Sequence, residues 1–291
     1  MIGAHDTEAC KMGKTDSLVY MENVWKRFGA VDAVCGVNFE VGYDEVVGLV
    51  GDNAAGKSTL MKILTGVHAP DRGQIYWQGQ LVNIRSPEDS RRLGIEMIYQ
   101  DLALAKKQDV ASNVFLGREP LKVYLRGLLK VIDKKFMLKE SQRLLDQLRI
   151  RIDSPAQKVG TLSGGQQQAV AIARTLSAPS PPRLVIMDEP TAALAVKEVG
   201  KVLHLVRQLK AQGISVILIS HRLVDIFEVC DRVVVLRRGQ KVGDKPINET
   251  NMEEVVRLMI GEENTEEETA QEARNGICGA QNKDSSIAYV R

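Results

Sequence analysis

The feature that most constrains this fold is a short segment bounded by glycines at residues 51–58, with the sequence Gly-Asp-Asn-Ala-Ala-Gly-Lys-Ser. It matches the Gly-x-x-x-x-Gly-Lys-Ser/Thr pattern of a phosphate-binding loop. An apolar run of strand length precedes it at residues 46–50, and an apolar-periodic stretch follows it at residues 59–64. Strand, loop and helix thus occur in the order that the chemistry requires, and a chance glycine-rich turn is the weaker interpretation.

The loop predicts a site for the phosphates of a nucleoside triphosphate. Backbone amides at the positive end of the following helix attract anions. We expect Lys57 to reach the β- and γ-phosphates and Ser58 to bind Mg²⁺. The residues predicted to hold the nucleotide here are Gly51, Asp52, Asn53, Ala54, Ala55, Gly56, Lys57, Ser58 and Thr59.

A second acidic motif follows the apolar run at residues 184–187 and consists of Asp188 and Glu189. On its own, such a pair is more often an ordinary loop or helix start. In an open α/β sheet, however, the carboxyl ends of the strands meet at one edge, where a phosphate loop also lies. We therefore expect Asp188 to help hold Mg²⁺ and Glu189 to act as the base, or to position the water, for attack on the γ-phosphate.

A third motif, Leu-Ser-Gly-Gly-Gln at residues 162–166, precedes a helical stretch that runs to Arg174. Ser163 is a good candidate for the N-cap, so the simplest interpretation is a helix start near Gln166.

Together, these three motifs with Gln100 and His221 resemble the nucleotide-binding subunit of an ATP-binding cassette (ABC) transporter, over about residues 17 to 260. The sequences at residues 94–104 and 189–194 are similar to those of bacterial monosaccharide import ATPases of the ribose, xylose and fructose type. The resemblance implies an ATPase coupled to transport, with ATP and Mg²⁺ bound.

The resemblance also implies roles for three single residues. Phe28 matches the aromatic residue that stacks on adenine, although a plain core phenylalanine remains an alternative. Gln100 matches the glutamine that contacts Mg²⁺ and the attacking water and senses the membrane partner. His221, which follows the apolar run at residues 216–219, matches the histidine that hydrogen-bonds the γ-phosphate.

In the family, the Leu-Ser-Gly-Gly-Gln helix points its amides at the γ-phosphate bound to the other subunit. The resemblance therefore implies a second ABC subunit as partner, as a homodimer that buries two ATP molecules. It also implies two integral-membrane permease subunits and, indirectly, a periplasmic or extracellular sugar-binding protein. The residues predicted to reach across are Ser163, Gly164, Gly165 and Gln166.

A further expectation is the permease seat, the surface of this chain on which a membrane subunit docks. By resemblance, a cleft lined from Gln100 to Leu104 and toward Phe115 receives a short cytoplasmic helix of the permease, with Leu102, Ala103 and Leu104 forming part of its apolar surface.

Two positions depart from the family pattern. Ala54 stands where glycine is usual, and an alanine with positive φ costs about 1 kcal/mol. Ala195 stands where many members have an aspartate that couples the two sites, so we expect weaker coupling and retained activity.

Composition restricts the partners and the location. The net charge of +2 and the lack of a basic tract do not favour nucleic acid. The scattered cysteines, Cys10, Cys35, Cys230 and Cys278, predict reduced thiols. The sequence has no apolar run long enough to span a bilayer and no signal-peptide pattern. We expect a peripheral protein at the cytoplasmic face of the plasma membrane.

The predicted fold is an α/β phosphate-loop NTPase core with a mostly parallel sheet, an N-terminal antiparallel β subdomain and an inserted α-helical subdomain. We expect a flexible segment at 1–16, the ATPase domain at 17–261 with its helical subdomain at about 105–178, and an acidic, disordered tail at 262–291. The expected helix at 133–150 presents an apolar face of Met137, Leu144, Leu145 and Leu148.

Two other functions stay open. One is a soluble ABC ATPase acting on ribosomes or DNA, which usually carries two cassettes or a long coiled coil, and neither pattern occurs here. The other is the cassette of an exporter or of another importer type.

Overall fold

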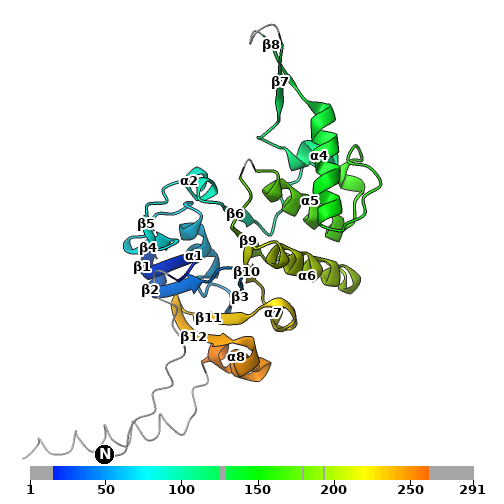
Figure 1. Ribbon diagram of the computed structural model, residues 1–291. Coiled ribbons are helices and arrows are strands. Elements are labelled where there is room, and N and C mark those ends of the chain that lie inside the picture. Colours follow the sequence, from blue (N-terminus) through cyan, green and yellow to red (C-terminus); the bar gives the residue numbers. More distant parts are fainter. Residues whose placement is uncertain (1–15, 125–128, 179, 193, 262–291) are drawn as a thin grey trace, which may run out of the picture.

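A six-stranded sheet forms the centre of the computed structural model, which describes residues 16–124, 129–178, 180–192 and 194–261 (Figure 1). The strand order is β12-β11-β3-β10-β9-β6, and every neighbouring pair is parallel except β11 and β12. The strands are β3 (Val46–Val50), β6 (Ile95–Ile98), β9 (Leu184–Asp188), β10 (Ser215–Ile219), β11 (Arg232–Arg237) and β12 (Gln240–Pro246). Strands β3 and β10 are buried throughout and rich in Val and Ile, as expected for parallel strands covered on both faces.

Four helices accompany this sheet along the chain. Helix α1 directly follows the phosphate loop, α6 and α7 follow β9 and β10, and α8 packs on β11 and β12. Their bounds are α1 (Lys57–Leu64), α6 (Val196–Ala211), α7 (Leu223–Val229) and α8 (Met252–Ile260).

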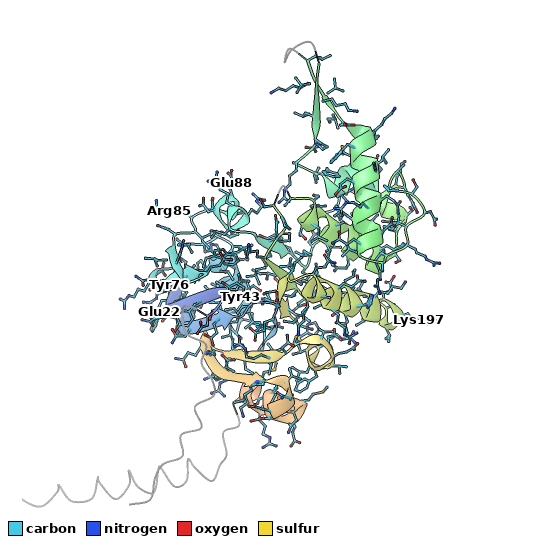
Figure 2. All side chains as sticks on the ribbon, viewed as in Figure 1. Glu22, Tyr43, Tyr76, Arg85, Glu88 and Lys197 are labelled. Atoms are coloured by element: carbon cyan, nitrogen blue, oxygen red, sulfur yellow. The ribbon has the colours of Figure 1, made fainter. Side chains whose placement is uncertain are left out.

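The N-terminal part forms a separate antiparallel sheet in the order β2-β1-β4-β5, which confirms the predicted β subdomain. Its strands are β1 (Val19–Phe28), β2 (Val31–Val41), β4 (Arg72–Trp77) and β5 (Gln80–Val82). Tyr76 and Glu22 lie side by side on it, with 3.3 Å between the phenol oxygen and the carboxylate (Figure 2). A short helix, α2 (Pro87–Arg92), follows, and the Ser86 side chain caps it by accepting from the Asp89 amide.

The third part is helical and contains α3 (Val110–Val114), α4 (Lys134–Gln147) and α5 (Gly164–Leu176). The expected apolar face of α4 is buried against α3 and α5. Short 3-10 turns occur at Val159–Thr161 and, near the C-terminal end, at Ile247–Glu249. A hairpin of β7 (Leu121–Tyr124) and β8 (Leu129–Ile132), which the sequence did not lead us to expect, projects beyond α4 (Figure 1).

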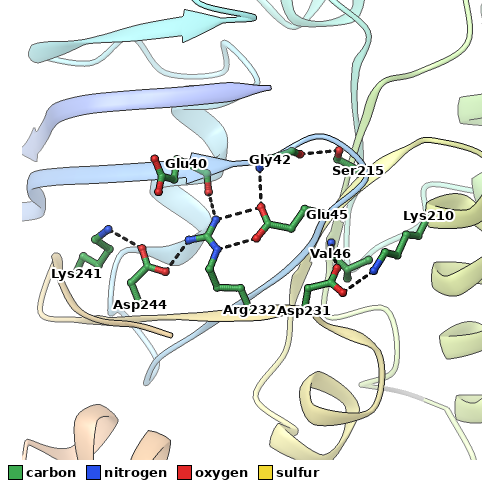
Figure 3. Close-up of polar contacts among 10 residues, drawn as sticks. All are labelled: Glu40, Gly42, Glu45, Val46, Lys210, Ser215, Asp231, Arg232, Lys241 and Asp244. Carbon is green, nitrogen blue, oxygen red and sulfur yellow. Dashed lines mark hydrogen bonds and ion pairs between the residues drawn. The ribbon is translucent and has the colours of Figure 1, made fainter. Parts of the chain in front are cut away.

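An ion cluster around Arg232 joins the two large sheets (Figure 3). The Arg232 guanidinium donates to both Glu45 carboxylate oxygens at 2.7 and 3.2 Å, to the Asp244 carboxylate at 2.6 Å and to the Glu40 carbonyl at 2.8 Å. Burial lowers the pKa of Arg232, but the hydrogen bonds and charges of Glu45 and Asp244 outweigh burial and raise it. The cluster therefore ties β2 to β11 and β12.

The boundaries of the helical subdomain at 105–178 stay a prediction, although α3, α4 and α5 lie between them. Apart from Asp16, the segments 1–16 and 262–291 lie outside the described residues, as do Cys10 and Cys278. Cys35 and Cys230 are free thiols. Among the described residues, none of the helices is both long and apolar enough to cross a bilayer.

Candidate nucleotide-binding site

Four predicted site segments follow four adjacent strands of the parallel sheet. The phosphate loop follows β3, His221 comes just after β10, Asp188 ends β9, and Gln100 comes just after β6. These strands are neighbours in the order β3-β10-β9-β6 and run in the same direction. The structure therefore brings all four segments to one edge of the sheet.

The phosphate loop requires glycine at both ends for steric reasons. Gly51 has a φ of 149° and Gly56 a φ of 100°. A Cβ on Gly51 would lie 2.2 Å from the Leu236 carbonyl oxygen, and one on Gly56 would lie 2.4 Å from the Ala33 carbonyl oxygen. The loop is thus held against two neighbouring backbone segments in a conformation that only glycine allows at these two positions.

Ala54 adopts the left-handed conformation, with a φ of 62°. The family glycine would take this conformation without strain, whereas alanine incurs a cost of about 1 kcal/mol. The departure noted in the sequence therefore has a local energetic consequence, while the course of the loop remains that of a phosphate loop.

Lys57 is buried within the loop. Its ammonium donates to the carbonyl oxygens of Gly51 at 2.7 Å and of Asp52 at 2.9 Å. Burial lowers the pKa of Lys57, and the nearby carboxylates of Glu189, Asp188 and Asp52 oppose this shift. The charge thus lies where loop amides and phosphates would meet, at the start of α1.

The two carboxylates at the end of β9 are close enough to affect each other. Burial raises the pKa of Asp188, the charge of Glu189 raises it further, and Lys57 and Lys62 oppose the shift. Glu189 has a φ of 49°, and its amide donates to the Ile219 carbonyl at 2.9 Å. Strained backbone of this kind concentrates at functional sites and needs support from its surroundings.

His221 and Glu189 form a pair across neighbouring strands. The distance between His221 Nδ1 and Glu189 Oε1 is 3.4 Å. The His221 side chain is 57% exposed and that of Glu189 is 21% exposed, so the pair opens toward solvent at the sheet edge.

The residues near the phosphate loop suit Mg²⁺ better than a metal ion whose ligands all come from protein side chains. Within the described ranges, no group of three or more His, Cys, Asp or Glu residues could hold a metal ion. Mg²⁺ is usually held by one or two carboxylates, waters and substrate phosphates. Asp188 supplies such a carboxylate, which is half-buried and has a raised pKa, and Ser58 is exposed at the start of α1. The donor set fits this ion; the individual roles of Ser58, Gln100 and Asp188 stay predictions.

Phe28 ends β1 with its ring 43% exposed, so it is not a core phenylalanine. The ring of His68 meets it edge-on at a centroid distance of 5.1 Å, and the Lys26 ammonium lies 5.6 Å from its centroid. An exposed aromatic face is what stacking on adenine requires. That role stays a prediction.

The Leu-Ser-Gly-Gly-Gln stretch begins α5 at Gly164, with Ser163 as its N-cap. The Ser163 hydroxyl accepts from the Gln166 amide at 3.4 Å, and the Gln166 side chain accepts from the Ser163 amide at 3.0 Å. In the described part of the chain, no hydrogen bond engages the amides of Gly164 and Gly165, and none joins residues 163–166 to the phosphate loop. The two amides at this helix start are therefore without an acceptor among the described residues.

Ala195 takes the N-cap position of α6 and, having no suitable side chain, makes no capping hydrogen bond. An aspartate at this position could cap the helix. The predicted weakening of site-to-site coupling remains a prediction.

Arg174 is a functional candidate that sequence reasoning missed. Its guanidinium, on α5, donates to the carbonyl oxygens of Asn113 at 2.9 Å, Ala103 at 3.4 Å and Leu102 at 3.5 Å. Burial lowers its pKa, and the charge of Arg118 lowers it further. The only sequence signal is a charged residue at the end of an apolar helix. Arg174 joins the segment after Gln100 to the helix that begins at Gly164.

The predicted permease seat, the surface from Gln100 to Leu104, is partly buried, and its role stays a prediction. Leu102 and Leu104 are half-buried and pack on the core of the helical part, and Phe115 is only 4% exposed. Phe115 packs against Phe136 at a centroid distance of 6.1 Å and belongs to the buried cluster on which Leu102 and Leu104 pack.

The parallel sheet, with the phosphate loop, Asp188 and His221 at one of its edges, defines a nucleoside triphosphatase of the phosphate-loop class. The model of the ABC transporter family matches residues 34–192. The chain belongs to the ABC transporter family and is an ATP-binding cassette.

Curated relatives share most of the described chain. It is 48% identical over 243 residues to a xylose/arabinose import ATP-binding protein of Sulfolobus acidocaldarius, covering 83% of this chain and 93% of the relative. It is 43% identical over 244 residues to a ribose import ATP-binding protein of Geobacillus kaustophilus, covering 84% of this chain and 48% of the relative. The chain therefore spans about half the length of the ribose relative.

A solved dimeric ATP-binding cassette, in a post-hydrolysis state bound to ADP and Pi, has a similar fold. The TM-score is 0.64 at 25% identity, covering 79% of this chain and 98% of that chain.

Proposed function

We propose that this chain is the ATP-hydrolysing subunit of a membrane importer of monosaccharides and that it works as a dimer. The observation that carries the proposal is the split of the site. Phosphate loop, carboxylates and His221 follow strands that end at one sheet edge, whereas the amides of Gly164 and Gly165 have no hydrogen-bond acceptor among the described residues and no hydrogen bond joins them to the loop. The import of pentoses by the two relatives supports the substrate class.

In the proposed mechanism, Lys57 and the loop amides bind the β- and γ-phosphates of ATP. Glu189 orients the attacking water and accepts its proton, while His221, 3.4 Å from Glu189, donates to the γ-phosphate. Mg²⁺, when bound, supplies charge that offsets the phosphate oxygens, and Ser58, Gln100 and Asp188 would hold it. The strained backbone at Glu189 fixes its carboxylate against the edge of β10.

The partner cassette completes the site. Its Ser163 to Gln166 helix start faces the γ-phosphate, because a helix N-terminus with unengaged amides stabilises an anion. Loss of the γ-phosphate removes this contact, so the dimer closes with ATP and opens after hydrolysis. The solved dimeric cassette with ADP and Pi supports dimerisation.

Two permease subunits would hold the dimer at the cytoplasmic face of the membrane, with a sugar-binding protein delivering the substrate from outside. The permease helix would sit on Leu102, Ala103 and Leu104. Arg174 would transmit a displacement of the permease helix to α5, since the Arg174 guanidinium donates to the carbonyls of Leu102 and Ala103.

Replacing Glu189 with Gln tests the catalytic proposal. The variant keeps the shape of the side chain but removes the base, so we expect ATP hydrolysis to fall by about 100-fold or more. Size-exclusion chromatography with ATP should show a stable dimer. Glu88→Gln, on exposed α2, is the matched control and should keep wild-type turnover. Wild-type turnover in Glu189→Gln would contradict the role of Glu189.

Uptake assays test the transport proposal. In a strain lacking this chain, uptake of xylose, arabinose, ribose or fructose should fall and return with the wild-type gene. Leu102→Asp should abolish uptake yet leave ATP binding intact. Undiminished uptake of all four sugars in the deletion strain would reject monosaccharide import.

A further inference from the structure

The β7–β8 hairpin exposes apolar side chains along both strands. Leu121, Val123, Leu129, Val131 and Ile132 are between 46% and 58% exposed. Figure 1 shows the hairpin extending away from the sheets, and Figure 2 shows side chains leaving both sides of it. Exposed apolar patches of this kind mark protein or membrane interaction sites.

The register places apolar residues on both faces of the hairpin. Leu121 lies opposite Ile132 and shares its face with Val123, since side chains alternate along a strand. Val131 lies opposite Lys122 on the other face, which also carries Leu129. A two-stranded antiparallel unit that packed one face on a protein would normally alternate apolar and polar residues. This hairpin has no polar face.

A two-stranded hairpin is marginally stable in water by itself. The ion pair of Lys122 with Asp133, at 3.0 Å, and the hydrogen bond from the Asp133 amide to the Pro120 carbonyl, at 2.8 Å, fasten its base. An apolar environment around the two strands would remove the free-energy cost of exposing both apolar faces to water.

The charge on the two strands is entirely basic. Lys122 and Lys130 are the only charged residues in Leu121–Tyr124 and Leu129–Ile132. In the portion of the chain that the structure describes, Lys130 makes no ion pair. A basic segment near an anionic membrane surface gains about 1 kcal/mol for each Lys or Arg.

We infer that the hairpin binds the head-group region of an anionic phospholipid membrane. A lipid surface can surround both apolar faces, whereas the groove of one protein partner would cover one. Its open strand edges keep it out of the hydrocarbon core, so it lies in the interfacial layer. The inference rests on the proposed function only in that the importer brings this chain next to a membrane.

Vesicle co-sedimentation of the full chain, without permease, tests this inference. We expect at least tenfold stronger binding to vesicles of phosphatidylcholine with phosphatidylglycerol than to phosphatidylcholine alone. Lys130→Gln should weaken binding to the anionic vesicles about fivefold, as the loss of one basic residue implies. Val123→Glu and Val131→Glu should each weaken it at least tenfold, because each removes an apolar contact and adds a repelled charge.

Leu81→Glu is the matched control. Leu81 is 60% exposed on β5, outside the hairpin, and its replacement should leave vesicle binding unchanged. Circular dichroism and ATP turnover of the hairpin variants should match wild type, which shows that they fold.

Equal binding of wild type and Val123→Glu would overturn the inference, as would equal binding to neutral vesicles. Self-association of the wild type that Val123→Glu abolishes, without vesicle binding, would show instead that a second copy covers the hairpin. Lys57→Ala separates the two proposals, because it should lose nucleotide binding and retain vesicle binding.

Discussion

His221 Nδ1 lies 3.4 Å from Glu189 Oε1, although the two residues follow different strands of the parallel sheet. The pairing arises because β10 lies beside β9, with Ile219 opposite Asp188 in the register. The Glu189 amide donates to the Ile219 carbonyl, so the same backbone that ends β10 holds Glu189 in position. Glu189 and His221, which we propose as base and γ-phosphate donor, are thus already side by side in the protein without nucleotide.

Replacing His221 with Ala should lower kcat for ATP hydrolysis by about 100-fold or more, because it removes a positioned hydrogen bond to the transferring group. Nucleotide affinity should change only a few-fold, since Lys57 and the loop amides remain. His204→Ala is the control, because His204 lies on α6 and contacts Gln208. Steady-state turnover and fluorescent nucleotide binding measure the two effects. A kcat near that of the His204 variant would rule out the proposed role.

Replacing Ala54 with Gly should leave the free energy of unfolding unchanged or raise it by up to about 1 kcal/mol, because the strain of positive φ is relieved while backbone entropy partly offsets the gain. Ala55, the adjacent residue, is 3% exposed and does not have positive φ. Ala55→Gly should therefore lower stability by about 1–2 kcal/mol through lost burial and added backbone freedom. Urea unfolding of both variants gives the comparison. A larger loss in Ala54→Gly than in Ala55→Gly would refute this account.

Much of the site was predictable because its signals are local or follow from parallel topology. The strand, loop and helix around Lys57 and the Ser163 cap are each encoded within a few residues. The convergence of Asp188, His221 and Gln100 follows once their strands are parallel, since parallel strands end at one edge.

The features that were not predictable depend on tertiary packing. The positive φ of Ala54 cannot be read from residue identity, because alanine rarely adopts this conformation. Arg174 bonds to carbonyls about sixty and seventy residues away. The β7–β8 hairpin was missed because each strand has only four residues. The alternation of apolar and polar residues runs only from Leu121 to Val123 and from Leu129 to Val131, which is too short to identify a strand.

Replacing Asp188 with Asn should raise the thermal stability of the nucleotide-free protein while lowering ATP turnover. Burial raises the pKa of Asp188, so the folded state favours the neutral form. The contribution of Asp188 to the free energy of unfolding is fully present below the ordinary pKa of about 3.9. It is lost as pH rises through the higher pKa of the folded state.

The difference in Tm between Asp188→Asn and wild type should therefore vanish at acidic pH and grow toward neutral pH. Differential scanning fluorimetry across this range without nucleotide measures it, with Asp32→Asn, at an exposed position, as control. A difference that does not change with pH would show that charge burial is not the cause.

Replacing Arg232 with Ala should lower the free energy of unfolding by about 3 kcal/mol, because it leaves the Glu45 carboxylate without its cationic partner and Asp244 paired only with Lys241 in a largely buried cluster. The control is Lys210→Ala, which breaks the more exposed pair with Asp231 and should cost less than about 1 kcal/mol. The double variant Arg232→Ala with Glu45→Gln should lose less free energy of unfolding than the sum of the losses in the two single variants. The reason is that Glu45→Gln removes a charge that Arg232→Ala leaves unpaired. Urea unfolding of the four variants measures these energies, and strict additivity would show that Arg232 and Glu45 contribute independently.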